Sequence, residues 1–385
     1  MGGFVKVSRR LLLAHINARK WPGLRRLLGI DICLFVCVAL LSLFGLVVIY
    51  SASDGNELLV RKQAINILVG FGLLLLVARL PISRYRFLVP FFWTGSLLLL
   101  LAVLIVGDVS KGGQRWLSLA GIRFQPSEIA KLSVPLTVAY YLRDQGMVLD
   151  WKQFGACLII IGLPALVIMK QPDLGTAILV LMSGGWLLMI VGMKRSIWIS
   201  TLLVFCLAIP TIWFHLYDYQ RYRILMLFDP ESDPFGAGYN IIQSKIAVGA
   251  GGLWGKGWLM GTQARLKYLP ESFTDFIFAV LGEEFGWIGC FFLTLMVSFV
   301  VCYVLNMAAK FTDGFERLAV AGLALVFFEA FFINIGMVVG ILPVVGVPLP
   351  FISYGGSSLL TFFIGFGLIM SIENATSERF STSAV

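Results

Sequence analysis

Long apolar runs restrict this chain more than any other feature. They lie at roughly 31–50, 63–80, 87–107, 127–142, 153–170, 173–192, 196–215, 275–308, 316–342 and 355–373. Most are close to the ~20 residues that an α-helix needs to cross a bilayer. They are continuous, whereas the strands of a membrane β-barrel alternate between apolar and polar residues. With 59% hydrophobic and 13% charged residues, the chain is too apolar for an ordinary soluble domain. The sequence therefore predicts an all-α integral membrane protein with ten transmembrane helices.

The distribution of lysine and arginine predicts how these helices are oriented. Short loops that alternate with the spans on one side carry Arg79, Arg84, Arg86, Arg143, Lys152, Lys194, Arg195, Lys310 and Arg317. Together with the basic residues of the N-terminal tail, these outnumber the lysines and arginines of the short loops on the other side. Such an excess marks the cytoplasmic side, and it explains the net charge of +9 without a nucleic-acid partner. We expect residues 1–30 to be a basic amphipathic cytoplasmic tail, 31–373 a single ten-helix membrane domain, and 374–385 a second cytoplasmic tail.

The longest polar segment, residues 215–274, is predicted to be a large extracytoplasmic loop between helices 7 and 8. In a protein whose other loops are short, so long a connection indicates a function. Its middle, residues 238–248, has helical spacing, because Tyr239, Ile242 and Ile246 share one face. We expect a short helix there, at the membrane surface.

A glycine-rich stretch, residues 249–261, follows this helix. It resembles a phosphate-binding loop around Lys256, but Ala250 stands in place of the first glycine and Gly257 in place of the required Ser or Thr. We interpret it as a flexible loop and not as a nucleotide site.

Asp275 stands where this loop ends and the apolar run 275–308 begins. A carboxylate at the edge of a bilayer is costly to bury, so it is a candidate for function, and partial desolvation makes it a better base. The alternative is structural: Thr274 or Asp275 would cap the amino end of the helix. The local sequence leaves both interpretations open.

Other polar residues also lie at the edges of the spans. Glu128 and Lys131 are three apart, so they share a helix face and can pair; the pair is either structural or part of a site for phosphate. Trp116, in the segment 108–126, is either an interfacial anchor or a substrate contact. Asp173 is most simply the N-cap of the sixth span.

Deeper positions carry further carboxylates. Glu283 and Glu284 lie about two turns into the span that follows Asp275, and Glu329 lies in the middle of the ninth span. Residues 348–358 are broken by Pro and Gly and can carry backbone polar groups into a protein-lined cavity. Polar groups gathered towards the outer side fit a transferase that acts on a lipid-anchored substrate. A transporter with polar groups along its path is the alternative.

The chain is identified, by its motifs, as resembling the SEDS family (shape, elongation, division and sporulation), and it looks closer to the elongation branch. The matching residues span about 115–358 in order. They are Arg115-Trp116, Gln125-Pro126-Ser127-Glu128, Gln171-Pro172-Asp173-Leu174-Gly175-Thr176, the segment 238–252, residues 269–278 with Glu283 and Glu284, and residues 353–358.

The resemblance implies a peptidoglycan glycosyltransferase that polymerises lipid II at the outer face of the plasma (inner) membrane during cell elongation. Asp275 is then the candidate general base, and Arg115, Trp116, Glu128, Lys131, Lys245 and Glu283 are candidate substrate-binding residues. A divalent cation, Mg²⁺ or Mn²⁺, suits the pyrophosphate; its ligands stay unknown, and no organic cofactor is expected.

Implied partners are a class B penicillin-binding protein transpeptidase and membrane proteins of the elongation complex. The rival hypothesis remains a transporter (flippase) that moves the lipid-linked precursor across the membrane.

Overall fold

The computed structural model describes residues 29–110, 113–119, 122–144, 148–216, 218–234, 236, 238–266 and 268–382. The tail predicted for residues 1–30 lies almost wholly outside them. The helices are α3 (Ile32–Ala52), α4 (Glu57–Ala78), α5 (Ile82–Val106), α6 (Pro126–Leu142), α7 (Trp151–Lys170), α8 (Leu174–Val191), α9 (Arg195–His215), α10 (Asp218–Phe228), α11 (Tyr239–Ala250), α12 (Thr262–Arg265), α13 (Ile277–Ala308), α14 (Gly314–Val338) and α15 (Ser357–Thr382), with a 3-10 turn η1 (Pro230–Ser232).

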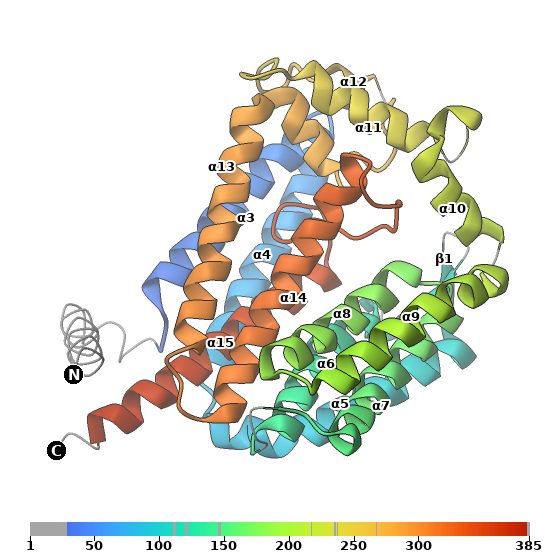
Figure 1. The fold of residues 1–385 in the computed structure, drawn as a ribbon. Coiled ribbons are helices and arrows are strands. Elements are labelled where there is room, and N and C mark those ends of the chain that lie inside the picture. Colours follow the sequence, from blue (N-terminus) through green and yellow to red (C-terminus); the bar gives the residue numbers. More distant parts are fainter. Residues whose placement is uncertain are drawn as a thin grey trace, which may run out of the picture.

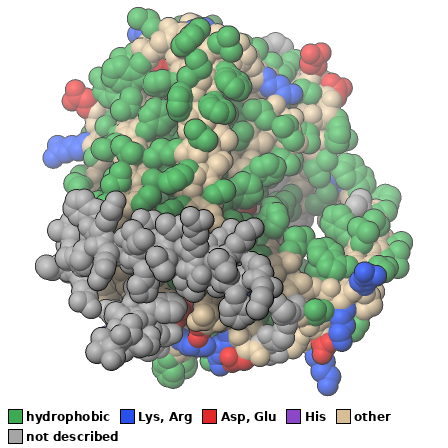
Figure 2. Space-filling view, turned by 60° about the vertical axis from the view of Figure 1, so that its left-hand side comes forward, with side chains coloured by type: hydrophobic (Ala, Val, Ile, Leu, Met, Phe, Trp, Pro, Cys, Tyr) green, Lys and Arg blue, Asp and Glu red, His purple; other side chains and the backbone are tan. Residues whose placement is uncertain are grey.

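Eight of the described helices are long and apolar enough to cross a membrane. Helix α6 has 17 residues, and the apolar part of α9 is Arg195–Ala208, so these two fall short of that requirement. The multi-pass helical architecture is therefore confirmed, and the count of ten spans stays a prediction. In Figure 2, hydrophobic side chains spread over the middle of the visible face and charged side chains lie mainly towards its upper and lower margins, as a bilayer requires.

Helix α14 is the centre of the bundle. It packs against α13 on one side and against α6 and α8 on the other, and α15 pairs with α4 (Figure 1). Close approach of α4 and α15 depends on Gly70, because a Cβ there would lie 2.1 Å from Phe363. Phe327 and Phe351 join the core where α14 and α15 meet, with ring centroids 5.8 Å apart.

A small antiparallel sheet stands at one end of the bundle, and the all-α prediction did not include it. Its strands are β1 (Asp108–Ser110), β2 (Gly113–Leu119) and β3 (Ile122–Phe124), in the order β1-β2-β3. The chain then enters α6 at Pro126, a residue that suits the first helical position because it has no N–H to satisfy. The sheet therefore carries Arg115, Trp116 and Arg123 to the start of α6.

Helix α11 confirms the short helix expected near residues 238–248. It packs against α13 and α14. The residues it buries are Ile241, Ser244 and Ala247, whereas Ile246 is exposed. The predicted face, which included Ile246, is thus not the one that meets the bundle.

Helix α13 is broken at Gly286, whose φ of 66° and ψ of −165° are not helical. A short limb, residues 277–285, is followed by a long limb, residues 287–308, which lies beside α3 and α14 (Figure 1). Helix ends leave backbone groups without partners, and the glycine-rich segment supplies them. The pairs are Lys256 N to Glu283 O at 3.0 Å, Gly257 N to Glu284 O at 3.0 Å, Trp287 N to Gly252 O at 2.9 Å and Ile288 N to Leu253 O at 3.2 Å.

The glycine-rich segment is therefore a docked part of the fold and not the flexible loop that we expected. A side chain would not fit at position 255, because a Cβ on Gly255 would lie 2.1 Å from the carbonyl oxygen of Glu284. The expectation of one straight span from residue 275 to 308 is also wrong. Glu283 and Glu284 end the short limb and do not lie along a continuous membrane helix.

Candidate functional site

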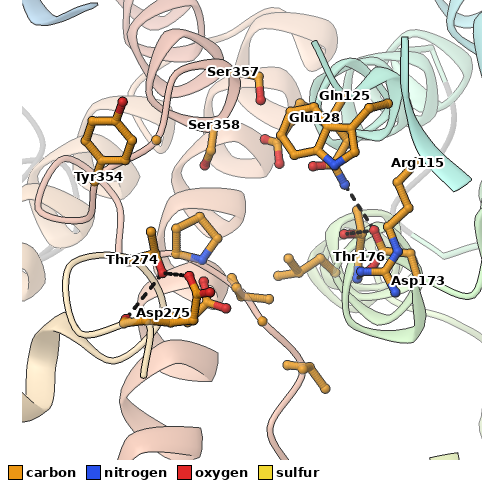
Figure 3. Close-up of a pocket in the computed structure, with 18 of the residues that line it drawn as sticks. Arg115, Gln125, Glu128, Asp173, Thr176, Thr274, Asp275, Tyr354, Ser357 and Ser358 are labelled. Carbon is orange, nitrogen blue, oxygen red and sulfur yellow. Dashed lines mark hydrogen bonds and ion pairs between the residues drawn. The ribbon is translucent and has the colours of Figure 1, made fainter. Parts of the chain in front are cut away.

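A cavity of about 590 Å³ opens between the sheet, the start of α6, the turn before α13 and the connection from α14 to α15. Its lining contains five of the residues predicted from sequence: Arg115, Trp116, Glu128, Lys131 and Asp275. Figure 3 shows Asp275 across the cavity from Arg115 and Asp173. The fold thus brings together groups that are up to 160 positions apart in the chain.

Four cations line the cavity: Arg115, Arg123, Lys131 and Arg223. Arg123 lies over the Trp116 ring at 5.7 Å from the centroid, and its Nε is 3.7 Å from a carboxylate oxygen of Asp108. Four cations around one cavity suit a ligand with several negative charges, such as a phosphate or a pyrophosphate.

Asp173 anchors Arg115, one of these cations. It is the N-cap of α8, as predicted, and accepts from the backbone N–H of Thr176 at 3.3 Å. Its other oxygen accepts from Gln125 Nε2 at 3.0 Å, and Arg115 lies 3.9 Å away. Arg115 also donates to the carbonyl of Pro172. The cap therefore also fixes a cation at the cavity wall.

Glu128 and Lys131 form the predicted pair, with 2.7 Å between Oε1 and Nζ. Both side chains are buried within the protein at the cavity wall. The second carboxylate oxygen of Glu128, Oε2, is buried and has no hydrogen-bond partner among the described residues. A buried acceptor without a partner is expensive, so this oxygen is available to a ligand or a hydrated ion.

Asp275 lies in the turn that leads into α13. The N-cap of α13 is Phe276, without a side-chain cap bond, so neither Thr274 nor Asp275 plays the structural role considered from sequence. The turn is held from outside: Asn334 Nδ2 donates to the Asp275 carbonyl at 2.9 Å, and Ser353 Oγ donates to the Thr274 carbonyl at 2.6 Å. The carboxylate of Asp275 therefore comes from a rigid turn.

Two predicted residues do not line the cavity. Lys245 is exposed on α11, and its side chain lies over Gly340, where a Cβ would be 2.1 Å from Lys245 Cε. Glu283 is fully buried and accepts from Lys256 Nζ at 2.7 Å and from Thr262 N at 2.8 Å. Their suggested contacts with substrate stay predictions.

Several lining residues were not singled out from the sequence. Arg223 and Asn240 come from the long loop, where charges and amides are too common to stand out. Glu271 lies four residues before Asp275, and it adopts an unusual φ of 56°. Tyr354, Ser357 and Ser358 belong to the Pro- and Gly-broken segment that was expected to reach a cavity.

The described residues contain no group of three or more His, Cys, Asp or Glu side chains that could hold a metal ion. Mg²⁺, however, usually keeps several waters and binds through one or two carboxylates plus substrate phosphates. The unpartnered Oε2 of Glu128, in a cavity lined by cations, is a carboxylate oxygen of that kind. The donor set therefore fits a cation that arrives with a phosphate-bearing substrate.

Comparisons with known proteins identify the family of this chain. The sequence model of the FtsW, RodA and SpoVE family, described as "Cell cycle protein", matches residues 31–378. Peptidoglycan glycosyltransferase MrdB of Escherichia coli K12 is 47% identical over 342 residues, which cover 88% of this chain and 92% of that protein. Probable peptidoglycan glycosyltransferase FtsW of Geobacter sp. M18 is 34% identical, covering 91% and 98%.

Solved structures show the same fold. One chain, from a study of a peptidoglycan synthase complex that coordinates polymerisation and crosslinking, has a TM-score of 0.80 and 29% identity, covering 90% of this chain and 98% of that one. The rod shape determining protein RodA of Thermus thermophilus has a TM-score of 0.69 and 25% identity, covering 90% and 97%. The chain belongs to the FtsW, RodA and SpoVE family.

Proposed function

We propose that this protein is a peptidoglycan glycosyltransferase that polymerises lipid II during cell elongation, with Asp275 as the general base. The observation that carries the proposal is the cavity itself. Asp275, on a rigid turn, lies across the cavity from Arg115, and Arg123, Lys131 and Arg223 also line the cavity. Related proteins of this length are named peptidoglycan glycosyltransferases.

Asp275 and the cations suit the two halves of the reaction. A sugar 4-hydroxyl loses its proton to Asp275 while its oxygen attacks the anomeric carbon of the second sugar. The new glycosidic bond forms as the bond from that carbon to the pyrophosphate oxygen breaks, and the pyrophosphate leaves on its lipid. An α-linked donor would give a β-linked product by this single displacement.

Charge on the leaving pyrophosphate grows in the transition state and is stabilised by fixed cations. Lys131 and Arg115 line the cavity and would serve this purpose, as would Arg123 and Arg223. Glu128 orients Lys131 through their ion pair. Trp116, with Arg123 on its ring, offers a flat surface for a sugar or a lipid.

A divalent cation, Mg²⁺ or Mn²⁺, is part of the proposal. When bound it would supply further positive charge to the pyrophosphate oxygens. Glu128 Oε2 is the protein group best placed to reach its hydration shell.

The proposal also sets orientation and partners. The cavity end of the bundle would face the periplasm or exterior, where lipid II presents its sugars, and both termini would lie in the cytoplasm. The partner would be a class B penicillin-binding protein transpeptidase within the elongation complex. A solved relative comes from work on a complex that couples polymerisation with crosslinking, which supports such a pairing.

The test uses the purified protein with its transpeptidase partner, lipid II and Mg²⁺ or Mn²⁺, and it measures glycan polymer. Asp275→Asn should abolish polymer and leave the thermal melt unchanged. Asp218→Asn is the matched control, because the Asp218 side chain is fully exposed, and it should retain activity.

Polymer from the parent and from Asp275→Asn alike would remove Asp275 as the base. No polymer from the parent, together with movement of lipid II across reconstituted vesicles, would favour the transporter instead.

A further inference from the structure

We propose that Asn334 is a positioning residue that sets the distance between the Asp275 carboxylate and the connection from α14 to α15. The inference rests on the proposed function, because it assigns Asn334 a role in the same reaction. Asn334 lies on α14 and is fully buried. It does not line the cavity, so it acts through the residues that it holds.

The contacts of Asn334 use its whole donor capacity. An amide nitrogen carries two hydrogens. Nδ2 donates to the backbone carbonyl of Asp275 at 2.9 Å and to the backbone carbonyl of Val347 at 2.7 Å. One side chain therefore joins the turn before α13 to the connection between α14 and α15.

This bridge places Gly346 next to Asp275, the proposed base. Gly346 has a φ of 74°, and a Cβ on it would lie 3.3 Å from Asp275 Oδ2. Both residues line the cavity. The absence of a side chain at Gly346 leaves room beside Oδ2, which is where an attacking hydroxyl must come within hydrogen-bond distance.

Neighbouring bonds hold the preceding part of the turn. Ser353 Oγ donates to the Thr274 carbonyl at 2.6 Å, and Tyr354 N donates to the Phe273 carbonyl at 2.9 Å. Asn334 completes this row at residue 275 itself. Its own carbonyl, Oδ1, is buried without a hydrogen-bond partner among the described residues, which is a penalty that an apolar residue of similar size would avoid. Asparagine at this position is therefore explained by the two hydrogen bonds that its Nδ2 donates.

The chain contains a matched control for this bridge. Asn374 on α15 also spans two backbone carbonyls, donating to Gly29 O at 2.6 Å and to Ala78 O at 3.5 Å. It lies about 25 Å along α15 from the cavity-lining Ser357, at 1.5 Å per residue. The same substitution at the two positions removes the same kind of contact, near Asp275 in one case and far from it in the other.

The experiment compares Asn334→Asp with Asn374→Asp in the full chain with its transpeptidase partner, with lipid II as substrate. Each variant is measured for kcat, KM and the thermal midpoint. Asn334→Asp should lower kcat about 10²-fold, the scale of a misplacement near 1 Å. Its KM should stay within about twofold, because the cations that line the cavity are untouched. Asn374→Asp should leave kcat unchanged. Asn334→Gln, which keeps both donors, should recover part of the lost kcat, and Asn334→Leu should not.

The outcomes separate the two proposals. A parent that makes no polymer overturns the proposed function and this inference with it. A parent that polymerises, with Asn334→Asp equally active or changed only in KM, overturns the inference alone. Loss of kcat at both positions in proportion to the fall in thermal midpoint would show a structural role and also overturn it. If Asn334→Asp does not fold, the contrast between Asn334→Gln and Asn334→Leu decides.

Discussion

Two lysine–glutamate pairs in this protein have the same length and a buried carboxylate, but different surroundings. Glu128 and Lys131 are 2.7 Å apart at the cavity wall, and Glu283 and Lys256 are 2.7 Å apart beneath the glycine-rich segment. In both, the carboxylate is removed from water. From sequence, both glutamates were candidates for binding substrate.

The difference lies in what the second carboxylate oxygen does. Glu283 Oε1 also accepts from Thr262 N and Thr262 Oγ1, both at 2.8 Å, and its Oε2 accepts from Gln263 N at 3.1 Å. Glu128 Oε2 has no partner among the described residues.

Both carboxylate oxygens of Glu283 thus accept hydrogen bonds from the protein, whereas one oxygen of Glu128 accepts none from the described residues. The distance within a pair does not distinguish a structural pair from a functional one. The count of remaining donors and acceptors does.

Lys131→Met should give the largest effect. It leaves Glu128 buried without its cation, which costs about 3–5 kcal/mol of stability, and it removes a cation proposed to stabilise the leaving group, which lowers kcat by about 10²-fold or more. Chemical denaturation and the polymerisation assay would measure the two effects. Lys194→Met, in an exposed pair with Asp150, is the control and should change stability by less than about 1 kcal/mol. Full activity in Lys131→Met would remove this residue from the mechanism.

Gly255→Ala tests the segment that saturates the second pair. The new Cβ would meet the Glu284 carbonyl, and the φ of 79° at this position is strained for alanine. We expect a loss of about 2–4 kcal/mol in unfolding free energy, measured by thermal or denaturant unfolding. Gly185→Ala on α8, where a Cβ would have open space, should be neutral or slightly stabilising. A melt unchanged in Gly255→Ala would mean that the docked arrangement is not maintained.

Glu283→Gln should be milder, because it keeps the shape and loses the charge that Lys256 and Thr262 contact. We expect about 1–3 kcal/mol less stability and an unchanged KM for lipid II. An increase in KM without a stability change would instead support the substrate contact predicted from the sequence.

A third pair, Arg86 near the start of α5 with Asp313 just before α14, extends the comparison to a partly exposed site. The atoms are 3.0 Å apart, with side chains 34% and 23% exposed. Burial alone would raise the pKa of Asp313, but the Glu316 backbone N–H and the Arg86 charge outweigh it and lower the pKa below 3.8. A lowered folded-state pKa means that this stabilisation is present above about pH 4 and is lost as the pH falls further.

Asp313→Asn should therefore cost at most about 1 kcal/mol near neutral pH, and the difference from the parent should shrink in acid. Unfolding measured between neutral pH and pH 3 would show it. A difference that grows in acid would contradict the assignment.

The sequence predicted those parts of the site that stand out against an apolar background. Asp275, Glu128 and Lys131 are charged residues at the ends of apolar runs, where a charge is costly to bury and therefore indicates a function. Asn334 is also polar within a span, but its role depends on Asp275, 59 positions away, and no local pattern indicates that contact. Arg223 was hidden for the opposite reason, since it is one cation among many in a polar loop.

The fold shows the same limit. Continuous apolar runs indicated the spans, because the interior of a bilayer requires apolar side chains. They did not show the break at Gly286, because Glu283, Glu284 and Gly286 are too short an interruption to end a long apolar run. The docking of the glycine-rich segment was missed for a related reason: it depends on backbone pairs between distant segments, and side-chain patterns do not record these.

The break in α13 also bears on how this helix fits a bilayer, because an unbroken helix would be too long and would carry two carboxylates into lipid. As one straight rod, its 32 residues would extend about 48 Å, well beyond the ~30 Å hydrocarbon layer, and Glu283 and Glu284 would be drawn into lipid. The long limb alone, residues 287–308, extends about 33 Å and matches that layer. The chain can therefore insert a span of ordinary thickness without carrying two carboxylates into the bilayer, and the short limb, residues 277–285, follows directly on the turn that holds Asp275.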